Sequence, residues 1–389
     1  MSYERVLSLP RLLRQKSFFL LGPRSTGKSF LIRTQLGEQA LVVDLLKSDN
    51  FLRLSSRPSE LEDMIRASPH PLVVIDEIQK LPALLDEVHR LIEERGTRFL
   101  LTGSSARKIR RGQANLLAGR AWQANLFPLV SSEIPDFDLT RYLTVGGLPQ
   151  VYGSVEPLEE LDAYVGTYLR DEIQAEGAVR NLPRFSRFLS IAALGTGQVL
   201  NFTNVARDLG IAPSTVIEHF RILEDTLVGF FVEPWGRSTT RKEVAAAKFY
   251  LFDVGVTNTL TRTRALDRHS DLYGRAFEQF IAMELRAALS YQRSQASLCY
   301  WRTRDRNEVD FVVGDHCAIE VKATERTSDR DGVSLRRLQA EAGLAAYYLV
   351  SQDPVERLKD GVRYLPWRRF LDLLWSGELL DSAGAKNGA

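Results

Sequence analysis

The sequence predicts an α/β fold that begins with a mostly parallel β-sheet covered by helices on both faces. Apolar segments begin near residues 18, 41, 72, 98 and 122, and stretches with helical spacing separate them, a pattern typical of strands joined by crossover helices. Two further patterns follow: a pair of short helices with two strands after residue 202, and alternating strands after residue 298. Together these observations predict three structural units.

Length and composition support a globular protein with more than one domain. The chain has 389 residues, of which 44% are hydrophobic and 26% charged, and one domain usually takes about 150 residues. We expect domains at 1–138, 139–272 and 273–380, followed by a disordered tail at 381–389. Because 51 Lys and Arg nearly balance 49 Asp and Glu, any contact with nucleic acid must come from local patches.

The sequence favours a soluble, cytoplasmic protein without a membrane partner. The first 13 residues lack the continuous apolar region of a signal peptide, and no apolar run approaches the roughly 20 residues of a membrane helix. Cys299 and Cys317 form no C-x-x-C pair and sit in apolar, strand-like segments. We therefore expect both cysteines to be reduced core residues.

A phosphate-binding loop follows the first apolar segment. Phe18–Leu21 leads into Gly22–Ser29, which has the pattern G-x-x-x-x-G-K-S, and helical spacing resumes at Phe30. The glycines let backbone N–H groups surround phosphate oxygens. This context favours a nucleotide site over a chance glycine-rich turn. The expected nucleotide contacts are Gly22, Pro23, Arg24, Ser25, Thr26, Gly27, Lys28, Ser29 and Phe30.

Charged side chains in this loop and after the third apolar segment suggest ATPase chemistry. Lys28 would neutralise the β- and γ-phosphates, and the Ser29 hydroxyl would bind Mg²⁺. Leu72–Glu77 ends in two carboxylates at the sheet edge where α/β proteins bind ligands. Asp76 is suited to the magnesium shell and Glu77 to polarising the attacking water. The alternative is a solvated strand end.

The fourth apolar segment also ends in polar residues. Arg98–Ser105 places Thr102 and Ser104 where the same sheet would bring them near the γ-phosphate or the attacking water. Both are candidates for sensing the nucleotide state. A serine-rich turn without a role is the alternative. A basic helix containing Arg107, Lys108, Arg110 and Arg111 is expected next.

These motifs resemble a known family. Gly22–Ser29, Val73–Glu77, Leu101–Ser105 and Gly119–Arg120 are similar to the AAA-type P-loop ATP-binding proteins of bacteria and archaea that carry a C-terminal domain of unknown function. The resemblance implies ATP as the nucleotide, and one strand between the loop strand and the Asp76 strand. It also implies, weakly, a role for Arg120 near the phosphates.

The middle unit begins at a turn-rich hinge and contains a helix-turn-helix pattern. Gly146–Pro149 and Tyr168–Asp171 resemble the start of the family's C-terminal region, without an evident mechanism. Residues 204–209 form a short helix stopped by Gly210, and a second helix begins at 213. The strands at 228–234 and 248–252 would form a wing.

A winged helix of this kind could bind DNA or another protein. Ser214 and Thr215 would face base edges if the second helix entered a major groove, and the wing loop carries Arg237, Arg241 and Lys242. Acidic residues on the same helix oppose contact with phosphates. They are Glu218, Glu224 and Asp225. A packing or protein-contact module is therefore the alternative, and His219 receives no role.

The last unit carries a group of charged residues with a second resemblance. Glu278 lies on an apolar helix, Asp310 on one strand, and Glu320 and Lys322 share a face of the next strand. This pattern resembles the restriction-endonuclease-like family, in which the acids hold a divalent metal at a scissile phosphate and the lysine stabilises charge. The alternative is an ordinary salt-bridged strand pair.

The leading functional hypothesis is a magnesium-dependent ATPase switch, with ATP and Mg²⁺ as cofactors and DNA as one candidate partner. One alternative is an ATP-regulated, metal-dependent nuclease. A third hypothesis is a nucleotide-switched protein-binding module without C-terminal catalysis, whose partner is another protein or a second copy of this chain.

Overall fold

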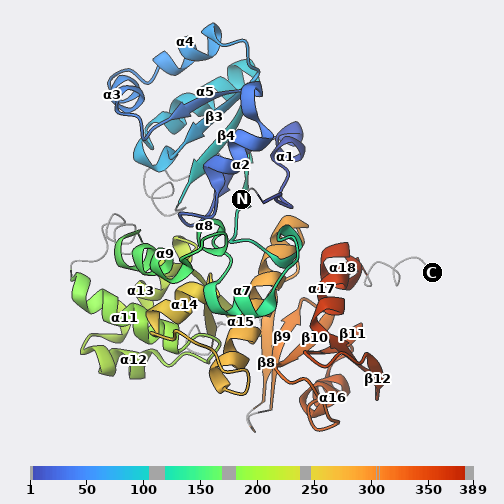
Figure 1. Ribbon diagram of the computed structural model, residues 1–389. Coiled ribbons are helices and arrows are strands. Elements are labelled where there is room, and N and C mark those ends of the chain that lie inside the picture. The colour runs from blue at the N-terminus through green and yellow to red at the C-terminus, as the bar shows by residue number, and fades with distance from the viewer. Residues whose placement is uncertain are drawn as a thin grey trace.

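The protein forms two packed bodies joined end to end (Figure 1). The computed structural model describes residues 3–104, 119–168, 181–236, 247–303, 305 and 307–381. The first body, at the top of Figure 1, contains the first sheet and its helices, and the middle and C-terminal elements pack together below it. None of the helices in these described ranges combines the length and apolarity needed to cross a membrane.

The first sheet has five parallel strands in the order β2-β3-β4-β1-β5. The strands are β1 (Ser17–Leu21), β2 (Ala40–Asp44), β3 (Leu72–Asp76), β4 (Arg98–Gly103) and β5 (Ala121–Asn125). The predicted α/β fold class is confirmed. The expected strand order is also present, because β4 lies between β1 and β3.

Alternating side chains of β1 pack against helices on the two faces of this sheet. Phe19 and Leu21 pack in one apolar cluster with side chains from α3 (Ser48–Ser56), α4 (Glu60–Ala67) and α5 (Leu84–Arg95). Phe18 and Leu20 pack on the opposite face with α1 (Leu9–Gln15) and α2 (Lys28–Gln35). Short 3-10 helices occupy Gly37–Gln39 and Ile78–Lys80. The period-2 alternation of a strand explains why each face receives its own core.

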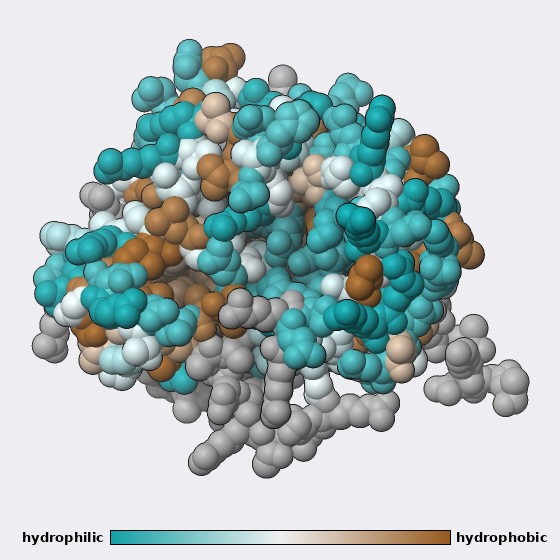
Figure 2. All heavy atoms as spheres, turned by 90° about the horizontal axis from the view of Figure 1, so that it is seen from below, coloured by the Kyte–Doolittle hydropathy of each residue, from teal (hydrophilic) through white to brown (hydrophobic). Residues whose placement is uncertain are grey.

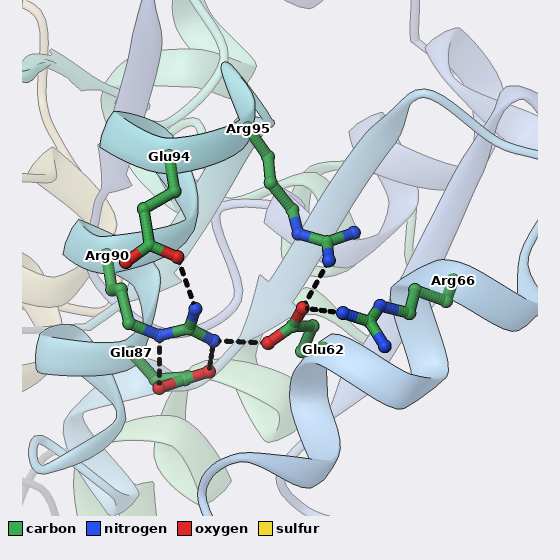
Figure 3. A network of polar contacts seen from close by, with 6 residues as sticks. All are labelled: Glu62, Arg66, Glu87, Arg90, Glu94 and Arg95. Carbon is green, nitrogen blue, oxygen red and sulfur yellow. Dashed lines mark hydrogen bonds and ion pairs between the residues drawn. The ribbon is translucent and has the colours of Figure 1, made fainter.

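An ion-pair network ties α4 to α5 on the surface of the first body (Figure 3). The Glu62 carboxylate pairs with Arg66 at 2.6 Å, with Arg90 at 2.5 Å and with Arg95. Arg90 also pairs with Glu87 at 2.5 Å and Glu94 at 2.6 Å. The hydrogen bond from Arg90 lowers the pKa of Glu62. Because solvent screens these pairs, we regard them as orienting the helices rather than stabilising the fold strongly.

The middle of the chain is mainly helical. After a 3-10 turn at Ser131–Glu133, its helices are α7 (Leu139–Val145), α8 (Pro149–Tyr152), α9 (Pro157–Ala163), a π-helix at Tyr164–Tyr168, α11 (Leu182–Leu194), α12 (Phe202–Leu209), α13 (Pro213–Asp225) and α14 (Val254–Leu260). Strands β6 (Gly229–Pro234) and β7 (Lys248–Leu251) form an antiparallel pair.

The helix pair and the strand pair lie where the sequence predicted them. Gly210, in the left-handed region at φ +63°, ends α12, and Ser214 and Thr215 are exposed at the start of α13. His219 lies between the rings of Phe185 and Phe188, with centroids 5.0 Å away. Burial lowers its pKa, so His219 is a neutral core residue. Binding to DNA stays a prediction.

The strands of the middle and C-terminal parts form one mixed sheet of eight strands, in the order β12-β13-β11-β10-β9-β8-β6-β7. The C-terminal strands are β8 (Leu298–Arg302), β9 (Glu308–Val313), β10 (Cys317–Lys322), β11 (Ala346–Ser351), β12 (Arg357–Lys359) and β13 (Val362–Pro366). Their helices are α15 (Asp271–Tyr291), α16 (Val333–Glu341), α17 (Trp367–Ser376) and α18 (Glu378–Asp381). Parallel pairing of β6 with β8 therefore crosses the predicted boundary at 272/273.

One apolar cluster extends from Leu129 to Leu379 and includes α15 along much of its length. The middle and C-terminal parts are consequently one packed body, although they are separate in sequence. Cys299 and Cys317 are buried and form no disulfide. Some predictions lie outside the described residues: the basic helix at 107–111, the segment 169–171, the wing-loop residues Arg237, Arg241 and Lys242, and the tail at 382–389.

The Gly146–Pro149 hinge has a packing role that the sequence did not reveal. Gly146 ends α7 at φ +75° and ψ −168°, a region that favours glycine. A Cβ there would lie 2.1 Å from Asp253 Oδ1. The Gly147 N–H donates to Asp253 Oδ2 at 2.7 Å, and Asp253 also caps α14 through Val256 N. Asp253 thus joins the hinge to α14.

We expect Gly146→Ala to lower the free energy of unfolding by about 3 kcal/mol, because it combines an unfavourable backbone conformation with overpacking. Chemical denaturation of both proteins measures this difference. Gly274→Ala is a matched control, since Gly274 lies within α15 and a Cβ there meets nothing within 4 Å. That change should be neutral or stabilising by up to about 1 kcal/mol. Equal stability of Gly146→Ala and wild type would contradict the packing role.

Candidate functional site

The Gly22–Ser29 loop connects the carboxyl end of β1 to the start of α2 (Figure 1). A Cβ at Gly22 would lie 2.4 Å from the carbonyl oxygen of Leu126, so only glycine fits there. Gly27 and Ser25 adopt φ +93° and +63°. Such left-handed residues turn successive N–H groups toward one concave side, which is the arrangement that binds anions.

Lys28 and Ser29 lie at the start of α2 and face polar partners. Lys28 is 7% exposed, and its Nζ donates to the carbonyl oxygens of Gly22 at 2.6 Å and Pro23 at 3.1 Å. Its ammonium therefore lies within the loop. The Ser29 hydroxyl donates to Asp76 Oδ2 at 3.0 Å. The structure thus joins two residues that are 47 positions apart in the sequence.

The ends of β3 and β4 bring two more of the predicted residues, Glu77 and Thr102, to Asp76. The Thr102 hydroxyl donates to Asp76 Oδ1 and accepts from the Glu77 N–H at 3.1 Å. Glu77 adopts φ +62°, an uncommon conformation for a residue with a Cβ, and such strain often occurs at functional sites. This conformation of Glu77 turns the chain directly after Asp76.

Gln79 is a residue that sequence analysis missed. Its Nε2 donates to Glu77 Oε2 and to Ser104 Oγ at 3.3 Å, while its buried Oε1 has no hydrogen-bond partner among the residues that the structure describes. Gln79 therefore orients Glu77 and links it to the end of β4. Its position two residues after the paired carboxylates was the only local signal.

The role that the family resemblance implied for Arg120 near the phosphates of its own chain is wrong. Arg120 directly precedes β5, whose first residue pairs with Ser17 at the amino end of β1. Arg120 Nε pairs with Glu93. The Gly22–Ser29 loop leaves the opposite end of β1, about 16 Å away for a strand of this length.

A cavity of about 460 Å³ lies beside the loop, between the two bodies. Loop and α2 residues Ser25, Gly27 and Phe30 form one side. The other lining residues are Tyr3, Arg5, Leu129, Pro149, Gln150 and Gly153. The N-terminal segment and the hinge after Gly147 thus meet at the loop. The sequence motifs of the loop and of the hinge did not predict this contact.

Arg5 lines this cavity and bonds to three separate parts of the chain. It is 8% exposed, and its guanidinium donates to the carbonyl oxygens of Thr26 at 2.8 Å and Phe127 at 2.6 Å. Its Nε also pairs with Glu133 Oε2 at 2.8 Å. The loop, the segment after β5 and the N-terminal segment are therefore held by one buried side chain.

Three family models match successive parts of the chain. Residues 14–135 match a family model described as an AAA domain. Residues 136–267 and 273–370 match two models that are each described as a domain of unknown function. The N-terminal domain therefore resembles nucleotide-binding proteins, and the domains that follow it carry no described function.

Three relatives of this chain are each described as an uncharacterized protein. A protein of Mycobacterium tuberculosis is 27% identical over 322 residues, which cover 79% of this chain and 70% of that protein. A protein of Methanocaldococcus jannaschii is 24% identical over 261 residues, or 64% of this chain and 52% of that protein. One of Haemophilus influenzae is 22% identical over 327 residues, or 75% and 78%.

The charged residues predicted in the last unit also gather in space. The Val321 N–H donates to Asp310 Oδ2 at 2.8 Å, and Lys322 Nζ donates to Glu320 Oε1 at 2.6 Å. Burial, and then the charge of Asp310, raise the pKa of Glu278 to about 7 and that of Glu320 to about 8. Asp310, Glu320 and Lys322 therefore lie on the neighbouring strands β9 and β10, and their role as a site stays a prediction.

A polar cavity of about 1010 Å³ opens beside these acids and is lined in part by Glu278, Lys322 and Arg275. Figure 2 views the molecule from below and shows a hollow in this face with mostly hydrophilic walls. Within the described ranges, however, no three or more His, Cys, Asp or Glu side chains are arranged to hold a metal ion. The predicted metal site at Asp310 and Glu320 stays a prediction.

Proposed function

We propose that the first body binds ATP with Mg²⁺ at the Gly22–Ser29 loop and hydrolyses it. The observation that carries the proposal is the convergence of Lys28, Ser29 and Asp76 at the carboxyl edge of a parallel sheet. Lys28 would neutralise phosphate charge, and Ser29 and Asp76 would hold the Mg²⁺ ion. The match of residues 14–135 to an AAA domain supports the same chemistry.

The cavity of about 460 Å³ beside the loop is suited to the nucleoside part of ATP. It has both apolar walls, from Phe30 and Pro149, and a polar side chain, Gln150. Stacking on apolar groups and hydrogen bonding to an amide are the contacts that a purine base requires. The loop backbone in the first body and the hinge in the second body would then contact the same bound ATP molecule.

The polar residues at the ends of β3 and β4 would perform the hydrolytic step. Water would attack the γ-phosphorus of bound ATP, the bond from that phosphorus to the β–γ bridging oxygen would break, and ADP would leave with this oxygen. The Glu77 carboxylate would accept a proton from that water. Gln79 would hold Glu77 in position through its Nε2 donor, and Thr102 would fix both Asp76 and the Glu77 backbone.

We infer further that this site acts as a switch on the second body. Arg5 binds the Thr26 carbonyl of the loop and Glu133, whose carboxylate also accepts from Val130 N at 3.2 Å. Ser131, which follows Val130, donates its N–H to Glu284 of α15 at 2.7 Å, and Trp375 also donates to Glu284. A movement of the loop backbone would therefore reach α15 through a short chain of buried contacts.

Helix α15 is suited to carry this movement further. It contains Glu278, which is one of the acids of the C-terminal site, and Glu284, which accepts from Ser131 and Trp375. It also contains Tyr291, whose hydroxyl accepts from Phe127 N at 3.2 Å. Glu278 and Tyr291 are about 20 Å apart along the helix axis. One rigid element thus contacts the first body at one end and the C-terminal site at the other.

ATP turnover and binding of a fluorescent ATP analogue by the full chain test the proposal. We expect binding that requires the loop, and turnover that requires Mg²⁺. The assay is repeated with single-stranded, double-stranded and structured DNA or RNA, because stimulation would identify nucleic acid as the partner. Turnover that no nucleic acid changes would favour a protein partner. Absence of nucleotide binding would remove the proposal.

The switch is tested separately by hydrogen exchange. We expect ATP to change amide exchange within α15 in wild type, and we expect Glu284→Gln to bind ATP as well as wild type but to lose most of that change. The substitution replaces one of the two acceptor oxygens with an NH₂ donor, so it breaks a bond to Ser131 or Trp375 while it leaves Arg5 and the loop intact. As a control, Glu341→Gln changes a carboxylate at the end of α16, distant from the network in sequence. An unaltered exchange response in Glu284→Gln would contradict this route.

A further inference from the structure

A lysine from the middle of the chain lies among the acids of the C-terminal site. Lys248, the first residue of β7, is 1% exposed. Its Nζ is 2.6 Å from Glu308 Oε1, 3.4 Å from Glu278 Oε1 and 3.7 Å from Asp310 Oδ1. It also lies 5.5 Å from the centroid of the Tyr300 ring. A single ammonium group therefore contacts three carboxylates.

The backbone fixes this lysine from both sides. Lys248 pairs with Val232 of β6 and forms a bridge with Val199, while Leu200 N donates to Ala247 O at 2.9 Å. Two residues later, the Tyr250 hydroxyl donates to Glu278 Oε1 at 2.5 Å. The strand thus delivers a cation and a hydroxyl donor to the same acidic group.

Burial of an ammonium group is costly unless opposite charges compensate it. The compensation here comes from residues that are 30 to 62 positions later in the chain, on α15 and β9. The interaction also crosses from the middle segment to the C-terminal segment. Lys248 is therefore placed by the tertiary structure for these acids.

We propose that the ammonium of Lys248 is the cation bound by Glu278, Glu308 and Asp310. It takes the place of the divalent metal ion that the sequence predicted beside Asp310. The C-terminal site is then an ion-paired joint between β7 and the C-terminal sheet, and it does not cleave phosphodiesters in this conformation.

The contacts of the individual oxygens support this proposal. Asp310 uses Oδ2 for Val321 N and has Oδ1 close to Lys248. Glu278 uses Oε1 for Tyr250 and Lys248, and Glu320 uses Oε1 for Lys322. A divalent ion prefers several carboxylate oxygens at 2.0–2.6 Å. Asp310 has both oxygens close to donors of the protein, and Glu278 and Glu320 have one each. A metal ion beside Lys248 would also be repelled by its charge.

Binding of Mn²⁺ by the full chain, without nucleotide, tests the proposal. We expect no Mn²⁺ site in wild type that Asp310→Asn removes. Lys248→Met keeps the approximate length of the side chain and removes the charge, so we expect this variant to gain one Mn²⁺ site, at least about tenfold tighter than any in wild type. The double variant with Asp310→Asn should lose it. Failure of folded Lys248→Met to gain a site would overturn the proposal.

Two further measurements cover a variant that folds poorly and the predicted activity. If Lys248→Met is unstable, added Mn²⁺ is expected to raise its midpoint of thermal unfolding more than that of wild type, because the ion would replace the lost ammonium. An equal response of both proteins would count against the proposal. Wild-type cleavage of DNA or RNA with Mg²⁺ or Mn²⁺ that Asp310→Ala abolishes would refute it directly.

Discussion

Replacing Lys28 with alanine is expected to weaken ATP binding by about 10- to 100-fold, the usual range for loss of a hydrogen bond to a charged group. Lys28 Nζ already lies within the loop, where it donates to the carbonyl oxygens of Gly22 and Pro23. A bound phosphate would offer this ammonium a stronger, charged acceptor at little reorganisation. Without it, the loop would lose the ammonium of Lys28 as a charged donor to phosphate and would depend mainly on its backbone N–H groups.

Titration with a fluorescent ATP analogue measures this loss. Lys47→Ala is the matched control, because Lys47 is exposed just before α3 and lies outside the loop. The control should bind as wild type does. The same affinity for Lys28→Ala and wild type would exclude Lys28 from phosphate binding and would weaken the whole assignment of the loop.

Replacing Glu77 with glutamine is expected to slow ATP hydrolysis by about 10²- to 10⁴-fold and to leave ATP binding intact. An amide has almost the same shape as the carboxylate but cannot accept a proton from water. The backbone contact from Glu77 N to Thr102 does not depend on the side chain, so the unusual turn at residue 77 should persist.

Single-turnover measurements separate this effect from product release. Glu38→Gln serves as the control, since Glu38 is exposed in the 3-10 helix Gly37–Gln39. Gln79→Ala should lie between the two, because it frees Glu77 without removing its carboxylate. Hydrolysis by Glu77→Gln at the wild-type rate would remove Glu77 from the mechanism.

Local patterns were sufficient for the strands of the first sheet and for the polar residues at its carboxyl edge. Strands β3 and β4 are short apolar runs that carry Asp76 and Thr102 near their carboxyl ends. Because carboxyl ends of parallel strands share one edge of a sheet, sequence alone implied that these residues would meet. The contacts Ser29–Asp76 and Asp76–Thr102 follow from that geometry.

Residues that act over long sequence distances could not be found in the same way. Arg5 contacts Thr26, Phe127 and Glu133, and none of these lies near it in the chain. The sequence places Lys248 only at the start of a predicted wing strand. Its role among Glu278, Glu308 and Asp310 depends on β6 joining the C-terminal sheet, and this pairing spans only Glu233–Cys299 and Pro234–Tyr300.

The parallel sheet, the Gly22–Ser29 loop and the identity of the acids in the last unit can be predicted from sequence, because neighbouring residues encode hydrophobic periodicity and glycine-rich loops. What surrounds those acids depends on how the chain folds. Charges interact through space, and a buried ammonium such as that of Lys248 is stable only where the fold supplies enough carboxylates. The partner of a buried charge therefore depends on strand pairing, which no local pattern specifies.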